Sequence, residues 1–165
     1  DTVRLFTDEP LMIDFGHAGA LKSVLASQTT AFRTKAFDAL ARKDSDALAV
    51  LEQTVPEIAA LRNAYGDFDA VLRRTQNVEL LEKACAEMNQ VRQRLHTEQV
   101  FVYCDLGETH GLNYHTGLVF GIYSLQRDQL LVRGGRYDHV GESFGRARAA
   151  TGFSADLKTL VRLTS

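Results

Sequence analysis

The chain has 165 residues, of which 45% are hydrophobic and 24% are charged, and its formal net charge is −2. This length suffices for one domain with its own core, and this charge gives no general attraction to nucleic acid or to an anionic membrane. Two cysteines, Cys85 and Cys104, cannot form a disulfide framework and fit a reducing cytosol. No long apolar run or signal peptide is present, so we expect a cytoplasmic protein that does not bind membranes. Because the chain begins with Asp1 rather than methionine, we expect a processed or truncated polypeptide.

The N-terminal part of the chain combines short apolar runs with turns. Residues 2–6 and 11–15 are predicted to be strands, separated by a turn at residues 8–10. A short helix is expected over about residues 19–27, and the pattern from residue 30 to residue 96 is helical.

The helical region contains recognisable helix ends. Asp44 or Ser45 can cap one helix, Pro56 suits the first turn of the next, and Gly66 suits a C-terminal stop. The last helix of the region is predicted to be amphipathic, because apolar side chains recur every three or four residues: Leu81, Ala84, Cys85, Met88, Val91 and Leu95.

The C-terminal part of the chain has the texture of strands. We predict strands at residues 100–103, 116–124 and 129–132, with a hairpin turn at residues 126–128 between the last two. The end of the chain, residues 153–163, is predicted to be a helix.

This order of elements predicts the domain organisation. Strands, then about 70 residues of helix, then further strands are typical of an α+β fold. We expect residues 1–29 and 98–165 to form two parts of one core and residues 30–97 to form a helical insertion.

Two glycine-containing stretches carry the residues that best suit a ligand site. Residues 110–117 turn through glycines into an apolar run, and residues 133–138 form a predicted basic turn with paired glycines. The aromatic side chains of Tyr114, His115 and Tyr137 have polar tips, which suit a small, polar, planar ligand. Without further information, these three residues are equally well explained as core aromatic residues at the ends of strands.

Several arginines follow the same stretches and can form a local cationic cluster: Arg133, Arg136, Arg146 and Arg148. Arginine side chains suit carboxylate or phosphate groups, so we regard Arg133, Arg136 and Arg146 as candidate anion-binding residues. A solvated basic face explains the same pattern equally well.

Metal and thiol chemistry are less well supported. The candidate ligands Cys104, His110, His115 and His139 match no standard zinc spacing, so we expect no metal site. Cys104 ends an apolar strand, where a buried and inert thiol is the usual finding. We therefore expect neither a metal nor a cofactor nor a nucleophilic cysteine.

The same stretches carry a resemblance to a known family. Residues 110–117 are similar to the first histidine-specific motif of histidyl-tRNA synthetases, and residues 133–138 are similar to the second. Residues 151–157 lie where class II synthetases carry their third motif, and residues 11–25 resemble the strand-to-helix step before the family's helical insertion. The resemblance implies part of a class II aminoacyl-tRNA synthetase-like domain, with an antiparallel sheet and a helical insertion.

Two departures from the synthetase pattern bear on catalysis. Synthetases have an arginine where this chain has His110, and a second arginine, which packs on ATP, at the position that matches Thr159. Both losses remove positive charge where an adenylation transition state develops negative charge, and such electrostatic effects are usually the largest in catalysis. The first and second class II motifs are not in this sequence, and we expect no catalytic residues.

Residues 144–154 resemble the regulatory subunits of ATP phosphoribosyltransferase, which are non-synthetase relatives of these enzymes. That resemblance implies a non-catalytic protein that associates with itself and with the short-form catalytic subunit, is required for the first step of histidine biosynthesis, and contributes to feedback by L-histidine. One alternative is a histidyl-tRNA synthetase fragment that activates histidine with ATP. Another is a tRNA-binding module, against which the net charge of −2 argues.

The resemblance also implies a ligand pocket inherited from the synthetases. Tyr114, His115 and Tyr137 would line the imidazole end of a bound histidine, and the backbone of Gly134 and Gly135 would allow its close approach. A histidine at position 115 departs from the tyrosine of the synthetases. These five residues are the predicted histidine-binding set.

Overall fold

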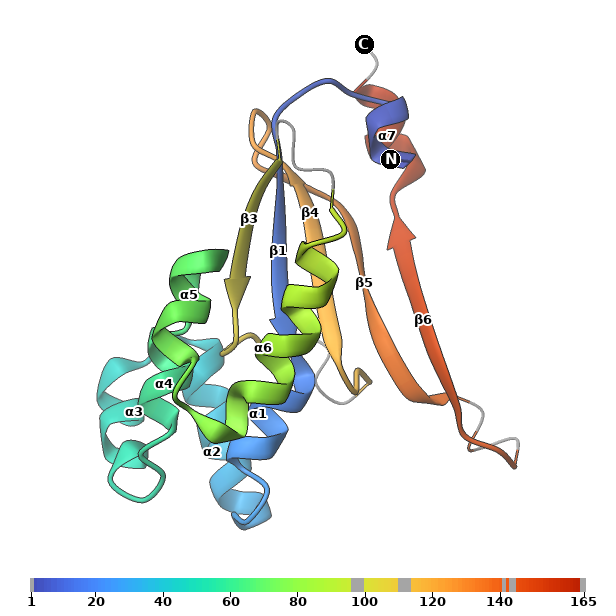
Figure 1. Ribbon diagram of the computed structural model, residues 1–165. Coiled ribbons are helices and arrows are strands. Elements are labelled where there is room, and N and C mark those ends of the chain that lie inside the picture. The colour runs from blue at the N-terminus through green and yellow to red at the C-terminus, as the bar shows by residue number, and fades with distance from the viewer. Residues whose placement is uncertain (1, 96–99, 110–113, 141, 143–144, 164–165) are drawn as a thin grey trace.

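The computed structural model describes residues 2–95, 100–109, 114–140, 142 and 145–163, which form a six-stranded sheet with helices (Figure 1). The strands lie in the order β2-β3-β1-β4-β5-β6. Their bounds are β1 Leu11–His17, β2 Tyr65–Asp67, β3 Val100–Asp105, β4 Leu118–Ser124, β5 Gln129–Val140 and β6 Arg148–Ala155. The helices are the 3-10 helix η1 Thr2–Leu5, followed by α1 Ala18–Val24, α2 Thr30–Ala41, α3 Ser45–Glu52, α4 Ile58–Asn63, α5 Phe68–Thr75, α6 Glu79–Arg92 and α7 Leu157–Arg162.

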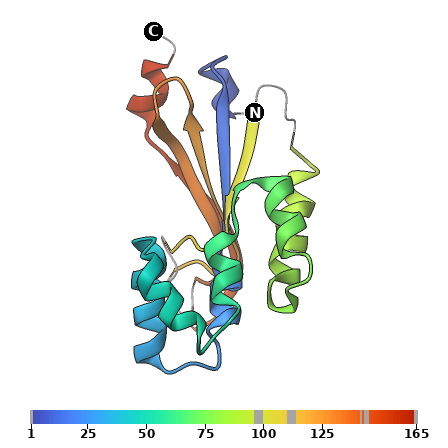
Figure 2. The same ribbon diagram turned by 90° about the vertical axis from the view of Figure 1, so that its left-hand side faces the viewer.

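The helices gather around one end and one face of the sheet. Figure 1 shows α1 to α5 near the end where β1 and β3 finish, with α6 lying across the sheet and α7 beside η1 at the opposite end. In Figure 2 the central strands are seen nearly edge-on, with α6 to one side of them. The main core lies between these helices and the sheet, and its fully buried side chains include Leu21, Leu40, Ile58, Phe68 and Met88. None of the helices in the described part of the chain has both the length and the apolarity that crossing a bilayer requires.

Several predicted elements are confirmed. Asp44 caps α3, because its carboxylate accepts the Ala47 backbone N–H at 3.0 Å. The amphipathic helix is α6, whose buried face contains Leu81, Ala84 and Met88. The predicted hairpin joins β4 to β5, and its turn ends at Asp128, which has a positive φ of 47°.

The sheet is mixed rather than purely antiparallel. Four of the five neighbouring strand pairs are antiparallel, but β1 and β3 run parallel, with Asp14 beside Tyr103. The helices between these two strands return the chain to the starting end of the sheet, which makes a parallel pairing possible. The fold remains α+β, because helices and strands occupy largely separate parts of the sequence.

The strand predicted at residues 2–6 is wrong, since Thr2–Leu5 forms a 3-10 helix. Its Val3 side chain is buried in a small second core with Leu160 and Leu163 of the C-terminal segment. Packing against α7 thus overrides the strand preference of these residues, as tertiary contacts commonly do.

The basic turn predicted at residues 133–138 is also wrong, because this segment lies inside the long strand β5. Both of its edges are paired: Gly134 lies opposite Phe120 of β4 and Phe153 of β6. Neither Gly134 nor Gly135 has the positive φ that a glycine turn would use. The glycines instead make room for neighbouring side chains.

Two further predictions need correction. The helix expected over residues 153–163 starts only at Leu157, because β6 continues to Ala155 and Asp156 then caps α7 through the Lys158 N–H at 2.9 Å. Gly66 does not end a helix: it lies within β2 with a φ of 118°, a backbone conformation that favours glycine.

Candidate functional site

A cavity of about 710 Å³ opens on the face of the sheet opposite α6. Successive residues of a strand point to opposite faces, so Phe15, packed against Phe68 of α5, faces the helices while Asp14 and Gly16 face the cavity. Strands β1, β4, β5 and β6 all contribute to its lining, together with the segments around residues 108 and 114–115.

Glycines on adjacent strands form a glycine floor beneath aromatic side chains that line the cavity. Gly135 lies opposite Gly152, and a Cβ atom on Gly135 would lie 2.6 Å from Cδ2 of His115. A Cβ on Gly152 would collide with the Tyr137 hydroxyl, and a Cβ on Gly121 would lie 2.8 Å from the Tyr123 ring. The missing side chains thus allow three aromatic rings to lie close to the sheet backbone.

Tyr114, His115 and Tyr137 form an aromatic cluster at one end of this cavity. The ring centroids of Tyr114 and Tyr137 are 4.7 Å apart, those of Tyr114 and His115 are 5.4 Å apart, and those of His115 and Tyr137 are 6.4 Å apart. These separations lie within the range of favourable aromatic pairs. The structure therefore brings together Tyr114 and His115 of the first predicted motif and Tyr137 of the second, which lies 23 positions after Tyr114.

The segment that carries this cluster is held from two sides. Lys22 of α1 donates a hydrogen bond to the His115 carbonyl at 2.7 Å. The Thr116 backbone N–H donates to the carbonyl of Arg136 on β5 at 2.9 Å, and the N–H of Asp138, also on β5, donates to the Thr116 hydroxyl at 3.1 Å. The cluster is thereby fixed relative to both α1 and the sheet.

Charged residues of both signs line the same cavity. Asp14 and Glu108 lie on one side of it, and Arg133 extends from β5 on another. Burial, followed by the neighbouring charges of Asp105 and Glu108, raises the pKa of Asp14 to about 6, while Lys43 opposes this rise. Lys43 itself is bonded to Asp105. A carboxyl group in such surroundings is a feature of functional sites.

The cavity contains site residues that the motifs do not predict. Asp14, Glu108 and Tyr123 line it but were not singled out from the sequence. A signal for Asp14 was present, since it is a charged residue within the apolar strand run of residues 11–15. Gly121 of β4 lies beside Asp14, and this position becomes apparent only once the strands are paired.

The three candidate anion-binding arginines do not line one cavity. Arg133 faces the cavity just described, whereas Arg136 points to the opposite face and bonds to Asp138 through Nε, at 2.9 and 3.1 Å. Arg146 is exposed and lines neither side. The cationic cluster expected from the sequence is therefore divided by the alternation of β5.

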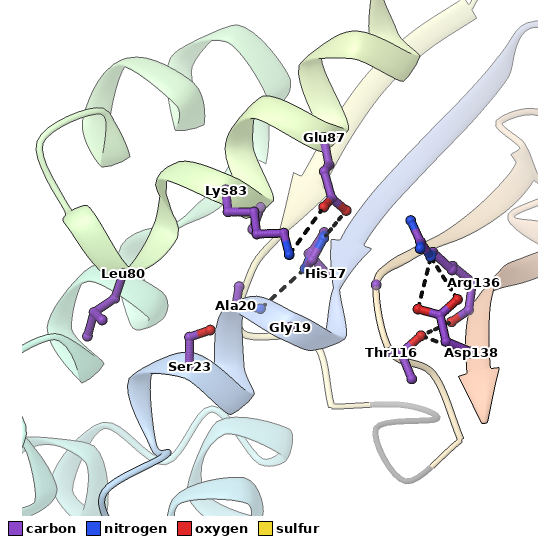
Figure 3. A pocket seen from close by; sticks show the side chains of 12 residues that line it. His17, Gly19, Ala20, Ser23, Leu80, Lys83, Glu87, Thr116, Arg136 and Asp138 are labelled. Atoms are coloured by element: carbon purple, nitrogen blue, oxygen red, sulfur yellow. Dashed lines mark hydrogen bonds and ion pairs between the residues drawn. The ribbon is translucent and has the colours of Figure 1, made fainter. Parts of the chain in front are cut away.

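Arg136 lines a smaller cavity of about 150 Å³ on the α6 face (Figure 3). Across it, buried His17 accepts the Ala20 N–H at Nδ1 (3.2 Å), so the ring proton is on Nε2, which faces Glu87 at 3.1 Å. Lys83 is 4.0 Å from the same glutamate. His17 thus caps α1 and links it to α6.

Thr159 and Cys104, the residues considered for ATP binding and for thiol chemistry, line neither of these two cavities. His110 and the adjoining residues 111–113 lie outside the described residues, as does Phe144. Thr159 is buried in α7, where its hydroxyl donates to Asp156 at 3.1 Å. Burial raises the pKa of Cys104 to about 12, which keeps the thiol protonated. Across the described segments, no three histidine, cysteine or acidic side chains converge as metal ligands would.

Known proteins are similar to this chain in sequence and in fold. The sequence model described as histidyl-tRNA synthetase matches residues 2–160. A Burkholderia cenocepacia protein, named ATP phosphoribosyltransferase regulatory subunit, is 34% identical over 99% of this chain and 45% of its own length. A Pseudomonas syringae pv. tomato protein of the same name is 37% identical over 92% of this chain and 42% of its own length.

The fold is also similar to that of a chain in the ATP phosphoribosyl transferase (HisG:HisZ) complex from Thermotoga maritima. The TM-score is 0.71 at 16% identity, covering 93% of this chain and 56% of that one. The chain spans less than half the length of the two sequence relatives. Because the family match extends over almost every residue, the chain belongs to the histidyl-tRNA synthetase family, with a class II synthetase-like mixed sheet.

Proposed function

We propose that the protein containing this chain is the regulatory subunit of ATP phosphoribosyltransferase and is required for the first step of histidine biosynthesis. The observation that carries this proposal is the identity of 34–37% with two proteins of that name over 92–99% of the chain. The similar fold in a HisG:HisZ complex is in keeping with it.

The proposed partner is the short-form catalytic subunit of the transferase, in a hetero-oligomer in which the regulatory subunit also associates with itself. The Thermotoga maritima complex supports this choice of partner, because one of its chains has the same fold. Light scattering on the eluate of a size-exclusion column tests the proposal: a mixed species larger than either protein alone is expected. Separate elution at micromolar concentrations of both proteins would contradict it.

We further propose that the protein is not an enzyme. Thr159 stands where a synthetase has an arginine that packs on ATP, and its hydroxyl is bonded to Asp156 at 3.1 Å. A neutral, buried side chain at this position gives no stabilisation to developing negative charge. We expect no histidine-dependent exchange between ATP and pyrophosphate, and such exchange would support the alternative of a synthetase that activates histidine.

The proposed effector is L-histidine, bound in the cavity with the aromatic cluster. Tyr114, His115 and Tyr137 would surround the imidazole. Gly135 would let the His115 ring pack close to the strand backbone, whereas the Cβ position of Gly134 points to Phe120 and Phe153 on the α6 face. To regulate, histidine must bind one state of the assembly more tightly than another, and such coupling is typically about 1–3 kcal/mol. Equal affinity for free and assembled protein would rule out this form of feedback.

A further inference from the structure

The edge of the sheet that β2 and β3 form carries an exposed aromatic surface. Val102 and Cys104 of β3 are buried in the main core, so Phe101 and Tyr103 point to the opposite face of the sheet. Because directly paired residues share a face, the register of β2 against β3 places Tyr65 there too. Phe101 is 54% exposed, Tyr103 41% and Tyr65 57%. Contiguous exposed apolar side chains of this kind mark sites of interaction.

Two carboxylates flank the Tyr103 ring of this aromatic surface. Tyr103 is in register with Asp67 on β2 and with Asp14 on β1, and residues paired in this way lie about 5 Å apart on one face. Asp67 caps α5, since its Oδ1 accepts the Ala70 N–H at 3.0 Å, and within the described segments its Oδ2 has no hydrogen bond. The Asp14 carboxylate has neither a hydrogen bond nor an ion pair among the same residues. Both carboxylates can therefore accept hydrogen bonds from an incoming cation.

One end of the aromatic surface already binds a cation of this chain. Lys43, in the turn before α3, places its Nζ 5.5 Å from the centroid of the Tyr65 ring. The same ammonium group is bonded to Asp105, which lies directly opposite Tyr65 in the sheet. Lys43 thus combines a cation–π contact with an ion pair. The Tyr103 ring and the carboxylates beside it offer the same two contacts to a cation from another molecule.

We propose that the aromatic surface docks a segment of the catalytic transferase subunit that carries an arginine or lysine beside an apolar side chain. The cation lies over Tyr103, between Asp67 and Asp14, and the apolar side chain covers Phe101, about 7 Å further along β3. Arginine suits this place best, because its planar guanidinium stacks on an aromatic ring while it donates hydrogen bonds to carboxylates. Tyrosine and arginine are also the residues that most often carry the binding free energy of an interface. This docking role rests on the proposed function, which names the partner.

The aromatic surface adjoins the ligand cavity but can be altered separately from it. Asp14 lines that cavity, whereas Asp67, Phe101 and Tyr103 are not among its lining residues. Variants of these three residues are therefore expected to leave the L-histidine affinity of the protein unchanged when the transferase is absent. The same variants should weaken binding of the transferase, which separates docking from effector binding.

Calorimetric titration of the short-form catalytic subunit into the protein containing this chain tests the docking role. Tyr103→Thr keeps a residue that favours strands and is expected to weaken binding about tenfold. Asp67→Asn keeps a side chain that can cap α5 but removes the charge, so we expect a loss of about threefold that shrinks as the NaCl concentration rises. Matched controls are Leu157→Thr, at the start of α7, and Asp128→Asn, in the hairpin between β4 and β5. Both controls change exposed residues elsewhere and should bind the transferase as the unaltered protein does.

The other outcomes each overturn the docking role in a recognisable way. If the unaltered protein and both surface variants bind the transferase equally well, the docking role is wrong while the proposed function stands. If the variants change only the self-association measured by analytical ultracentrifugation, a second copy of the protein occupies the surface instead. If they markedly lower the midpoint of urea unfolding, the aromatic surface is covered within the protein itself. If the unaltered protein does not bind the transferase, the docking role and the proposed function are both wrong.

Discussion

Lys22 of α1 donates a hydrogen bond to the backbone carbonyl of His115 at 2.7 Å, across 93 positions of sequence. Burial lowers the pKa of Lys22, so the ammonium group gives up part of its hydration to make this contact. The bond ties the first helix after β1 to the segment that carries the aromatic cluster. Lys22 can thus determine where a ring of the proposed ligand site lies.

Replacing Lys22 should therefore weaken ligand binding without unfolding the protein. One intramolecular hydrogen bond contributes about 0.5–1.5 kcal/mol, so Lys22→Met is expected to lower L-histidine affinity by about three- to tenfold. Lys22→Arg, which can donate to the same carbonyl, should restore most of the affinity. The control Lys35→Met alters an exposed lysine of α2 and should have no effect in the same titration. An unchanged affinity in Lys22→Met would show that the bond does not position His115.

Adding one methyl group at a glycine should destabilise the protein more at Gly135, beneath the His115 ring, than at Gly117. In Gly135→Ala the added carbon would lie 2.6 Å from the His115 ring and 2.9 Å from the Leu118 carbonyl, so the ring must move. Such overpacking costs about 1–3 kcal/mol, which urea unfolding would measure. In Gly117→Ala the nearest atom is the flexible Cδ of Arg136 at 3.1 Å, and a smaller loss is expected. Equal losses in the two variants would contradict the proposed packing of His115 on Gly135.

Asp14 should make the protein less stable at neutral pH than at mildly acidic pH. Its pKa in the folded protein is raised to about 6, chiefly by burial, so the folded state holds this proton more tightly than the unfolded state does. The associated stability is complete below the unfolded pKa, near 4, and is lost as the pH rises through about 6. Asp14→Asn should therefore increase the free energy of unfolding by about 1–3 kcal/mol at pH 8 and have little effect at pH 4.

Urea titrations of both proteins at pH 4, 6 and 8 would measure this difference. A gain in stability that accompanies a loss of ligand binding would identify Asp14 as a residue retained for function. A variant that is destabilised at pH 8 would contradict the assignment of Asp14 as an unpaired carboxylate.

His17 is expected to act through structure rather than chemistry. In His17→Leu the buried Ala20 N–H loses its acceptor, and we expect a loss of about 2–3 kcal/mol in the free energy of unfolding. In His17→Asn the amide oxygen can accept the same hydrogen bond, so the loss should be smaller by about 1 kcal/mol. Thermal unfolding of both variants measures the difference. Identical destabilisation would show that the cap does not account for this histidine.

Local signals predicted the elements that depend on neighbouring residues. The apolar repeat that includes Leu81 and Met88 predicted α6, because helix periodicity is set within a few turns of chain. Asp44 predicted the start of α3, because a capping side chain bonds within its own first turn. The hairpin turn that ends at Asp128 belongs to the same class of local feature.

Features that depend on strand pairing were either not predicted or predicted wrongly. Gly134 and Gly135 indicated a turn, but β4 and β6 pair on both sides of them, and sequence spacing does not reveal partners 14 or more residues away. Once β5 is recognised as a strand, its alternation places Arg133 and Arg136 on opposite faces. Asp14 becomes a site residue only because β1, β4 and β5 bring it into register with Arg133. The aromatic cluster, by contrast, was anticipated through the family resemblance of both motifs.

The most direct test of the central claim is an assay of the short-form catalytic subunit of ATP phosphoribosyltransferase. Turnover of the catalytic subunit would be measured under three conditions. These are the catalytic subunit alone, the catalytic subunit mixed with the protein containing this chain, and the same mixture during a titration of L-histidine. We predict activation on mixing, reversal of the activation by histidine, and a weaker histidine response in Arg133→Gln. A transferase whose turnover is unchanged by the added protein, at concentrations where both are folded, would contradict the regulatory role.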